Sequence, residues 1–596
     1  MHKQILILLF SLLLTVSCGS SSKSGTKNKV DIKIISMAVE EKSLNVMRDI
    51  LSKNGFNPTI NMLPDYASFT GQLEANNYDI AINSWNTVTG NPDYAVRSLF
   101  LSDGDYNYSK ISNAQLDELI EKASAESFAD SKATYSEIEK IIIDENAYII
   151  PLYNRVKTQA FNKTIVDENT VKIYKAASIN AGEISFVDKT KNETEPLYIS
   201  QTVSSLTSLD PIKGNDGSIN FINNQMYVRI VTLTTNDQIS TENSLSYNYA
   251  IASGNKDYYF VLRDDIYFAK VENKKAVDSG ERVGASDVVF SLNRAKDRNS
   301  VPNHRTYSLH SSMEKISIVT DINELKNTKT DTSDVYTELS KNLPAPISSL
   351  TSVTSQADNK NGVYQVVKVT TVKPFPQVLN YLAHQSAGIV SESQIKKVNT
   401  YNVANYDPQK DICYGDESTI TEGNSYNNTL YTSGQYIAVY KNDYEVVLER
   451  NPGFMKDTDK FPKIKTVTIK FIKDLDAAVS SLRSGDIYVL YDIVADKLKV
   501  IESDSNLVLQ TMPSNALIFA FLNMSDGHVT KDINIRKAVL YSADQNAFIA
   551  VNDGYGYKAY TTLSPLVDTG NTLTADKNKV QQYLKAYEES KASSNQ

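Results

Sequence analysis

Apolar and polar positions near the start of the chain alternate between strand and helix patterns. Residues 30–36 (VDIKIIS) and 57–62 have the pattern of short strands, and Leu44, Met47 and Ile50 recur between them at helical spacing. Gly55 is placed to end that helix. The pattern therefore predicts a βαβ unit. Amphipathic helices at 113–125 and 131–143 and a strand at 153–161 continue the α/β character.

Residues 78–93 (YDIAINSWNTVTGNPD) hold the only tryptophan in the chain, Trp85. Positions 78–84 alternate as in a half-buried strand, and the Gly-Asn-Pro at 90–92 then breaks the pattern. Trp85 is thus expected at a strand end that opens into a loop, where a pocket can form. The alternative is a core tryptophan, since large aromatic side chains are mostly buried wherever they lie.

Residues 187–196 are charged, lack apolar periodicity and end at Pro196, so they are interpreted as an internal linker. Beyond them the pattern is richer in strands and turns, with residues 395–430 expected to form a long loop and 434–450 a hairpin. Strands are expected at 197–200, 257–262, 266–268, 465–471, 487–491 and 516–523, and helices at 286–295, 375–382, 476–483, 533–542 and 579–587.

The first eighteen residues have the pattern of a bacterial export signal. A short basic start precedes a twelve-residue apolar run at 5–16, which is too short to span a bilayer as a mature helix. The sequence TVSCG at 15–19 resembles a lipobox, which makes Cys18 the expected lipidation site. A plain secreted protein is the alternative. Residues 19–29 are expected to form a flexible tether, and with Cys18 lipidated, Cys413 has no cysteine partner.

Length and charge narrow the function classes. A chain of 596 residues is expected to divide into several domains. Its net charge is −9 with both signs interspersed, which excludes the concentrated basic surface that nucleic-acid binding needs. The 36 tyrosines suit surfaces that grip mixed polar and apolar ligands, although codon bias explains the count equally well.

No motif for catalysis or metal binding stands out. The chain lacks the G-x-S-x-G, H-E-x-x-H, Walker A and G-x-G-x-x-G sequences, so no enzyme activity and no cofactor is predicted. His304, His310 and His384 do not form a ligand-spaced set, and we predict no metal site. A secreted hydrolase is kept as an alternative from another class.

From residue 197 onward the chain resembles the bacterial extracellular solute-binding proteins of the peptide/nickel class, the oligopeptide and dipeptide receptors of ABC importers. The resemblance rests on segments in the family's order. These are SLDP at 208–211, YYFVLRDDIYF at 258–268, VGASDVVFSLNRA at 283–295, PFPQVLNYL at 374–382, GIV at 388–390, VLERNPGF at 447–454, LRSGD at 482–486 and DINIRKA at 532–538.

The family's C-terminal third stands at the front of this chain. Residues 30–62, 78–92, 112–125, 135–144 and 150–154 follow it in order. The chain therefore resembles a circular permutant, whose junctions fall in polar, aperiodic segments where permutation is tolerated. A domain-swapped or mis-joined gene product is the alternative.

The resemblance implies an α/β, two-lobed periplasmic-binding-protein fold with a hinge and an additional third domain. Lobe one would comprise residues 150–235, including the junction linker 187–196, and 385–508. The additional domain would comprise 236–384. Lobe two would comprise 509–596 and 30–149, so that both chain ends lie in it.

The resemblance also implies ligand-binding residues. Trp85, Asn86 and Val88 would form one wall. In the peptide receptors an Asp that holds the peptide's ammonium group follows this Trp by three positions, and here that position is Val88. A buried ammonium would thus lack its charge partner. The opposite wall would include Gly214, Asn215, Asp216 and Gly217, with Tyr307 from the additional domain.

The implied function is that of a substrate-binding lipoprotein of an ABC importer, which captures oligopeptides or a related small solute by hinge closure. Its partners would be the solute and the permease subunits, with the membrane contacted through the lipid alone. The protein would be a monomer in the cell envelope, facing the periplasm or the exterior. A surface receptor or adhesin on the same fold remains an alternative.

Overall fold

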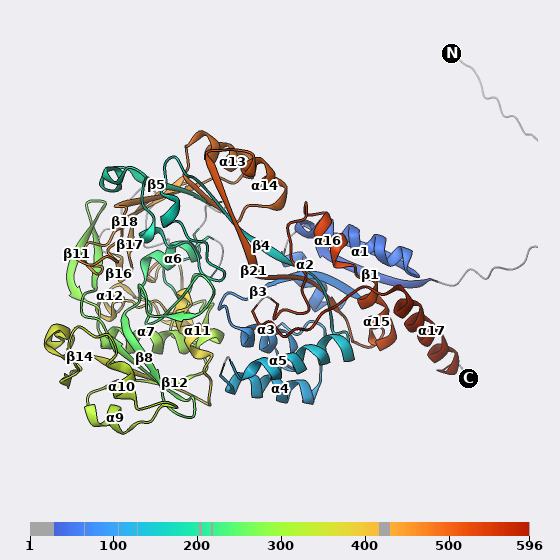
Figure 1. The fold of residues 1–596 in the computed structure, drawn as a ribbon, viewed down its shortest axis with the longest axis horizontal. Coiled ribbons are helices and arrows are strands. Elements are labelled where there is room, and N and C mark those ends of the chain that lie inside the picture. Colours follow the sequence, from blue (N-terminus) through green and yellow to red (C-terminus); the bar gives the residue numbers. More distant parts are fainter. Residues whose placement is uncertain are drawn as a thin grey trace, which may run out of the picture.

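The computed structural model describes residues 29–594 except 65, 105, 128, 202–205, 216–217, 417–428 and 565. The expected signal sequence with Cys18 lies outside the described residues. Two blocks stand side by side, and long strands run between them (Figure 1). Within the described ranges, no helix has the length and apolarity that crossing a bilayer requires.

A ten-stranded sheet extends through both blocks. Its strands, in spatial order, are β17 (Tyr436–Lys441), β18 (Glu445–Arg450), β19 (Thr466–Phe471), β5 (Pro196–Gln201), β20 (Val489–Tyr491), β4 (Ile149–Asn162), β21 (Leu507–Leu522), β3 (Ile80–Asn86), β1 (Val30–Met37) and β2 (Phe56–Leu63). The sheet is mixed: the run from β19 through β5 to β20 and the run from β3 through β1 to β2 are parallel, and the other neighbours pair antiparallel. The predicted α/β class is therefore confirmed.

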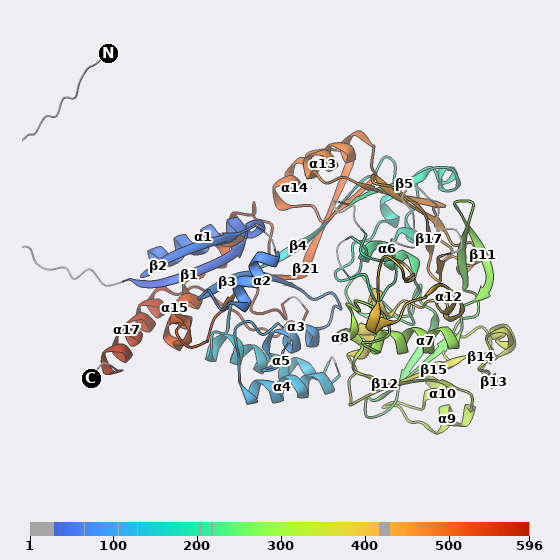
Figure 2. The same ribbon diagram turned by 180° about the vertical axis from the view of Figure 1, so that it is seen from behind.

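The block that contains both ends of the described chain is built from its first and last segments (Figure 2). One apolar core joins residues 32–153 to residues 517–587. Strands β1 and β2 pair in parallel around α1 (Glu41–Lys53), which confirms the predicted βαβ unit. Helices α2 (Tyr66–Glu74), α3 (Pro92–Phe100), α4 (Ala114–Ala125), α5 (Ser131–Lys140), α15 (Ile533–Ser542), α16 (Gln545–Ala550) and α17 (Lys577–Ser594) complete this block.

The other block contains five further apolar cores, two of them large. The first surrounds β5, β17, β18 and β19, with α6 (Asn220–Met226), α12 (Glu392–Val398), α13 (Leu475–Ser484) and α14 (Ala495–Glu502) nearby. The second lies against a separate four-stranded sheet in the order β12 (Met313–Val319), β15 (Val366–Thr371), β9 (Asp257–Leu262) and β8 (Ser246–Ile251).

Helices and short strands complete this second block. They are β6 (Thr232–Leu233), β7 (Ile239–Ser240), β10 (Tyr267–Glu272), β11 (Lys275–Arg282), α7 (Ala285–Lys296), α8 (Tyr307–His310), α9 (Ile322–Asn327), α10 (Val335–Leu339), β13 (Ser349–Leu350), β14 (Val363–Tyr364), α11 (Val378–Ala383) and β16 (Tyr431–Thr432).

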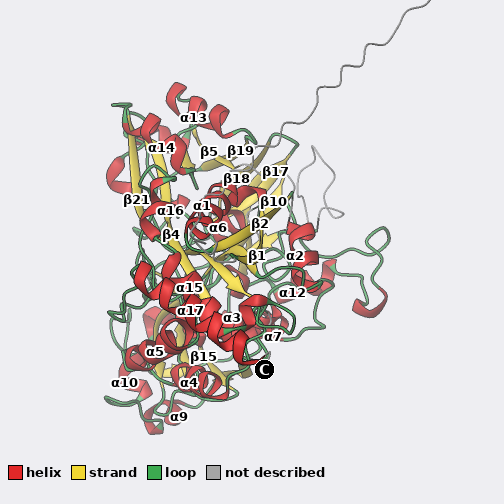
Figure 3. Ribbon diagram, turned by 90° about the vertical axis from the view of Figure 1, so that its right-hand side faces the viewer, coloured by secondary structure: helices red, strands yellow, loops and turns green. Residues whose placement is uncertain are grey.

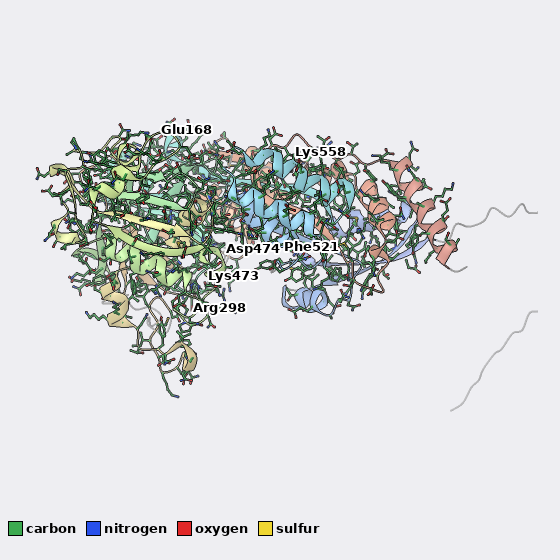
Figure 4. The ribbon with its side chains drawn as sticks, turned by 90° about the horizontal axis from the view of Figure 1, so that it is seen from below. Glu168, Arg298, Lys473, Asp474, Phe521 and Lys558 are labelled. Atoms are coloured by element: carbon green, nitrogen blue, oxygen red, sulfur yellow. The ribbon has the colours of Figure 1, made fainter. Side chains whose placement is uncertain are left out.

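Strands β4 and β21 carry the chain from one block to the other, side by side and antiparallel (Figure 3). Phe521 of β21 is labelled in the block of the chain ends in the view from below (Figure 4). The pairing is interrupted midway, where Pro513 opposes Val156 but Leu517 opposes Asn154. Extra residues on one strand bend and twist a ladder, so this bulge is a natural position for a hinge.

Three local expectations need amendment. The long loop at 395–430 is wrong at its start, because α12 continues to Val398 after Ser391 caps it. The break at 90–92 does not lead into a long loop, because Pro92 is the first residue of α3 and Asn91 caps that helix. Residues 187–196, expected to be a linker, contain a short 3-10 helix at Lys189–Glu193.

Candidate functional site

Trp85 lies near the end of β3 and is partly buried. Its ring contacts Tyr94 at 5.2 Å and Tyr106 at 5.3 Å between centroids, the second edge-on. The indole Nε1 is sealed from solvent and has no hydrogen-bond acceptor. A buried indole N–H ordinarily finds a partner, because leaving it unpaired costs free energy.

The turn that follows β3 contacts the second block at helix α11. The Nδ2 of Asn91 donates to Oδ1 of Asn380 at 3.2 Å, and Nδ2 of Asn380 donates to the carbonyl of Thr89 at 3.2 Å. Tyr381 donates its hydroxyl to Asp93 at 3.4 Å. Trp85 therefore lies beside a direct contact between the two blocks.

A second contact between the blocks centres on Asp237, in the turn between β6 and β7. Its Oδ2 accepts from Nδ2 of Asn515 in the β21 bulge at 2.7 Å, and its Oδ1 accepts from the backbone of Ala176 at 3.1 Å. Burial raises the pKa of the Asp237 carboxyl. Gly90 has a φ of +63° and faces this carboxyl so closely that a Cβ there would lie 2.7 Å from its Cγ.

A cavity of about 260 Å³ lies in the second block, between residues 172–183, the end of α6 and the hairpin β6–β7. Its lining consists of Lys172, Tyr174, Ala177, Ser178, Ile179, Asn180, Glu183, Asn224, Gln225, Tyr227, Val228, Arg229, Thr232, Leu233, Thr234, Thr235, Ser240, Glu242, Asn243, Ala383, Gly434, Gln435 and Phe454. The hairpin thus forms a wall of the cavity and contacts the other block through Asp237.

Most charged groups of the cavity are paired. Lys172 lies 2.9 Å from Glu183, and Glu242 forms an ion pair with Lys460. Arg229 differs, because no carboxylate of the described residues lies within ion-pair distance of it. Burial lowers the pKa of Arg229 to about 10, so the guanidinium is charged at neutral pH.

The residues predicted as ligand contacts do not share this cavity. Asn86 is exposed and Val88 is partly buried in the turn beside Trp85. Gly214 is buried, and its carbonyl accepts from Gln385 at 2.8 Å. Asn215 is partly exposed, and Tyr307 begins α8 with its ring edge toward His304. Asp216 and Gly217 lie outside the described residues. The role of these residues in binding stays a prediction.

The place of the missing ammonium partner at Val88 is not taken by Asp93. That carboxylate is fully buried and accepts from Arg97 at 3.2 Å, and Ser124 also donates to it. It therefore belongs to the ion network of α3. A positive group on a solute would need another carboxylate.

Sequence reasoning missed Arg229 and Asp237. Arg229 is a lone charge in the apolar run MYVRIV at 226–231. A charge at such a position is rarely buried unless it is paired or functional, and this signal was available. Asp237 gave no signal, since it occupies an ordinary turn whose partners come from remote segments.

Two histidines next to the cavity wall share one hydroxyl. Nε2 of His310 and Nδ1 of His384 each lie 2.7 Å from Oγ of Ser386. Burial lowers the pKa of His310 to about 3 and that of His384 to about 4, so both rings are neutral at pH 7. Within the described part of the chain, no group of three or more His, Cys, Asp or Glu side chains is arranged to hold a metal ion.

The sequence profile of the bacterial extracellular solute-binding proteins, family 5, matches residues 242–593. This range is more than half of the 596-residue chain. The chain therefore belongs to this family, as the resemblance in its sequence predicted.

Two curated relatives are similar to parts of the chain. The oligopeptide-binding protein AppA of Bacillus subtilis is 31% identical over 129 residues, which are 21% of this chain and 23% of AppA. The glutathione-binding protein GsiB of Escherichia coli K12 is 20% identical over 367 residues, which are 61% of this chain and 55% of GsiB. The matches thus span about a quarter to about half of the relatives' length.

Solved structures of binding proteins are also similar. The periplasmic binding protein DppA of Helicobacter pylori in complex with the peptide STSA has a TM-score of 0.35 at 16% identity, with 53% of this chain and 50% of that chain covered. AppA of Bacillus subtilis in complex with a nonapeptide has a TM-score of 0.34 at 15% identity, with 52% and 46% covered.

Proposed function

We propose that this protein is the substrate-binding component of an ABC importer, which captures a peptide or a related small solute between its two blocks and delivers it to a membrane permease. Family membership supports the binding role. The relatives are named as binding proteins for oligopeptides and glutathione, which supports a peptide-like solute.

The observation that carries the proposal is that β4 and β21 run from one block to the other and have a bulge between two separate apolar cores. The apolar core of one block uses residues 149–153 and 517–522, whereas Ala160 and Leu507 belong to a core of the other. Residues 154–156 and 513–516 lie between these cores. Bending at this bulge would open and close the blocks without disturbing either core, as a hinge motion requires.

In this mechanism the solute shifts the equilibrium between open and closed forms toward the closed form. In the closed arrangement the blocks are joined by hydrogen bonds of Asn91, Asn380, Tyr381 and Asp237 and by the ion pair between Lys373 and Glu121. Contacts of this kind contribute about 1 kcal/mol each, so an open form would remain accessible. A solute that contacts both blocks only when they are closed favours closure by its differential affinity. The closed form would then present the surface that the permease recognises.

We also propose that the order of segments is a circular permutation and that Cys18 anchors the chain by lipid. Both ends of the described chain lie in one block, since β1 and α17 contribute to the same core. A lipid tether would then emerge from that block. Residues 30–149 and 509–596 as one lobe, 150–235 and 385–508 as the other, and 236–384 as an additional domain remain our proposed division.

Fluorescence of Trp85 tests the proposal directly. Because it is the only tryptophan, its emission reports on its own surroundings. We expect a mixture of tripeptides, titrated into the full chain, to shift the emission of Trp85 with saturation. Trp85→Phe serves as the control that identifies the signal. Solute binding shown by calorimetry with unchanged emission would return Trp85 to a purely structural role, and cleavage of the peptides would favour a hydrolase.

A further inference from the structure

Arg229 stands in the wall of the cavity with half of its hydrogen-bonding capacity unused. Its Nη1 donates to the carbonyl of Tyr227 at 3.0 Å and to that of Asn224 at 3.4 Å. Its Nε is sealed from solvent without an acceptor, and Nη2 donates to none of the described residues. Nε and Nη2 lie along one edge of the guanidinium, and this edge pairs with a carboxylate through two parallel hydrogen bonds.

Arg536 is buried with its Nε and Nη1 on backbone carbonyls, whereas two other arginines with little exposure have a carboxylate partner within the protein. Arg294 donates to Asp210 at 2.6 Å, and Arg263 donates from Nε and Nη2 to the two oxygens of Asp265 at 2.9 and 2.6 Å. Burying a guanidinium without such a partner costs free energy. The two carboxylates that line the cavity, Glu183 and Glu242, are occupied by lysines. Arg229 therefore lacks an anion that a bound molecule can supply.

We infer that the cavity binds a carboxylate group of the transported solute, held by the Nε and Nη2 edge of Arg229. The inference rests on the proposed solute-binding function and specifies its substrate class. The guanidinium is charged at neutral pH, since the pKa of about 10 lies well above it. In this binding mode the side chain of Arg229, which lines the cavity, would rotate so that the sealed Nε also meets the carboxylate.

The remainder of the cavity suits a polar solute of modest size. Thr232, Thr234 and Ser178 line it beside Asn243, with Leu233 and Phe454 as apolar surface. A volume of about 260 Å³ accommodates a small acid or the carboxyl-terminal part of a peptide. The carboxylate can thus come from a peptide terminus or from another organic acid.

Calorimetry with matched probes tests this inference on the full chain. The probes are a tripeptide mixture with free C-termini, the same mixture with amidated C-termini, and succinate as a carboxylate that is not a peptide. We expect the free acids to bind at least about 100-fold more tightly than the amides, because a buried guanidinium would otherwise stay unpaired.

Three variants accompany the probes. Arg229→Met should weaken binding of the free acids by about 100-fold and remove the preference over amides, and Arg229→Lys should recover part of it because the charge remains without the planar edge. Arg229→Met should not lower the melting temperature of the solute-free protein, since it removes an unpaired buried charge. Arg263→Gln, the matched control, should keep the preference.

The outcomes separate the inference from the proposed function. Equal binding of acids and amides would overturn the carboxylate inference and leave peptide binding intact. Binding of succinate that depends on Arg229, without binding of any tripeptide, would support the inference and overturn the peptide solute. Loss of melting temperature in Arg229→Met with an unchanged acid preference would assign Arg229 a structural role only. Failure of every probe at millimolar concentration would overturn both.

Discussion

At the scale of single residues, several buried polar atoms without a hydrogen-bond partner lie where the two blocks meet. Trp85 Nε1, the hydroxyls of Thr87 and Thr89, and Oδ1 of Asn515 are all buried without a hydrogen-bond partner. Buried polar groups in folded proteins are ordinarily satisfied, so a group of exceptions needs a reason. A solute or ordered water between the blocks supplies one. The neutral pair His310 and His384 lies at the other side of the cavity, where Arg229 disfavours a charge on His384.

The acid sensitivity of the fold should depend on His384. Its pKa of about 4 in the folded protein lies below the usual 6.5, chiefly because of burial. The unfolded chain therefore binds the proton more readily, and the free energy of unfolding should fall as the pH drops from about 6.5 to about 4. The loss should reach about 3 kcal/mol.

Urea unfolding at several pH values measures this effect. His384→Asn, which keeps an oxygen near the position of Nδ1, should reduce the slope of the curve between pH 4 and 6.5. The slope that remains should come from His310, whose pKa burial lowers to about 3. His528→Asn is the matched control, because His528 contacts Asp79 and does not line the cavity. Parallel curves for the wild type and His384→Asn would contradict a neutral buried histidine.

At the scale of elements, the turn between β3 and α3 lies next to Trp85 and also contacts the other block. Trp85 precedes the turn, and its last residues hold α11 of the other block through Asn91 and Asp93. Asn380 of α11 accepts one hydrogen bond from Asn91 and donates another to the carbonyl of Thr89. In the proposed mechanism these bonds would break when the blocks open, so they would contribute to closure and not to the fold of either block.

Asn380→Ala should therefore weaken solute binding without unfolding the protein. Losing two hydrogen bonds in the closed form is expected to cost about 1–2 kcal/mol, which corresponds to a dissociation constant about tenfold larger. Calorimetry with the tripeptide mixture measures it, and thermal melting checks the fold. Asn323→Ala, at an exposed position of α9, is the control. A decrease in melting temperature that accounts for the whole loss would assign Asn380 to stability alone.

The sequence predicted the elements whose signals are local. The helix at α7 was recognisable because Asp287 follows Gly284 by three positions, where its carboxylate accepts from the backbone N–H of Gly284. The hairpin β17–β18 was recognisable because Asn442 marks its turn. Helix α3 was missed, since Pro92 reads as a breaker although it equally starts a helix. The cavity was missed too. Its walls come from residues 172–183, 224–243 and 434–435, and only the fold brings these together.

At the scale of the whole molecule, the first and last described residues lie in one block, and the chain passes through the other block between β4 and β21 (Figure 1). Two crossings at a single bulge allow one dominant motion, in which the blocks rotate about residues 154–156 and 513–516. The hairpin β6–β7 transmits this motion to the cavity, because Asp237 in its turn contacts Asn515 at the hinge. Binding and closure are thus coupled in the proposed mechanism.

Small-angle X-ray scattering of the full chain, with and without a saturating tripeptide mixture, tests this coupling most directly. The account predicts that the radius of gyration decreases on saturation, because solute shifts open molecules to the closed arrangement described by the structure. Asn380→Ala should start from a larger value and decrease further. An unchanged radius of gyration, with binding verified by calorimetry in the same sample, would contradict capture by hinge closure.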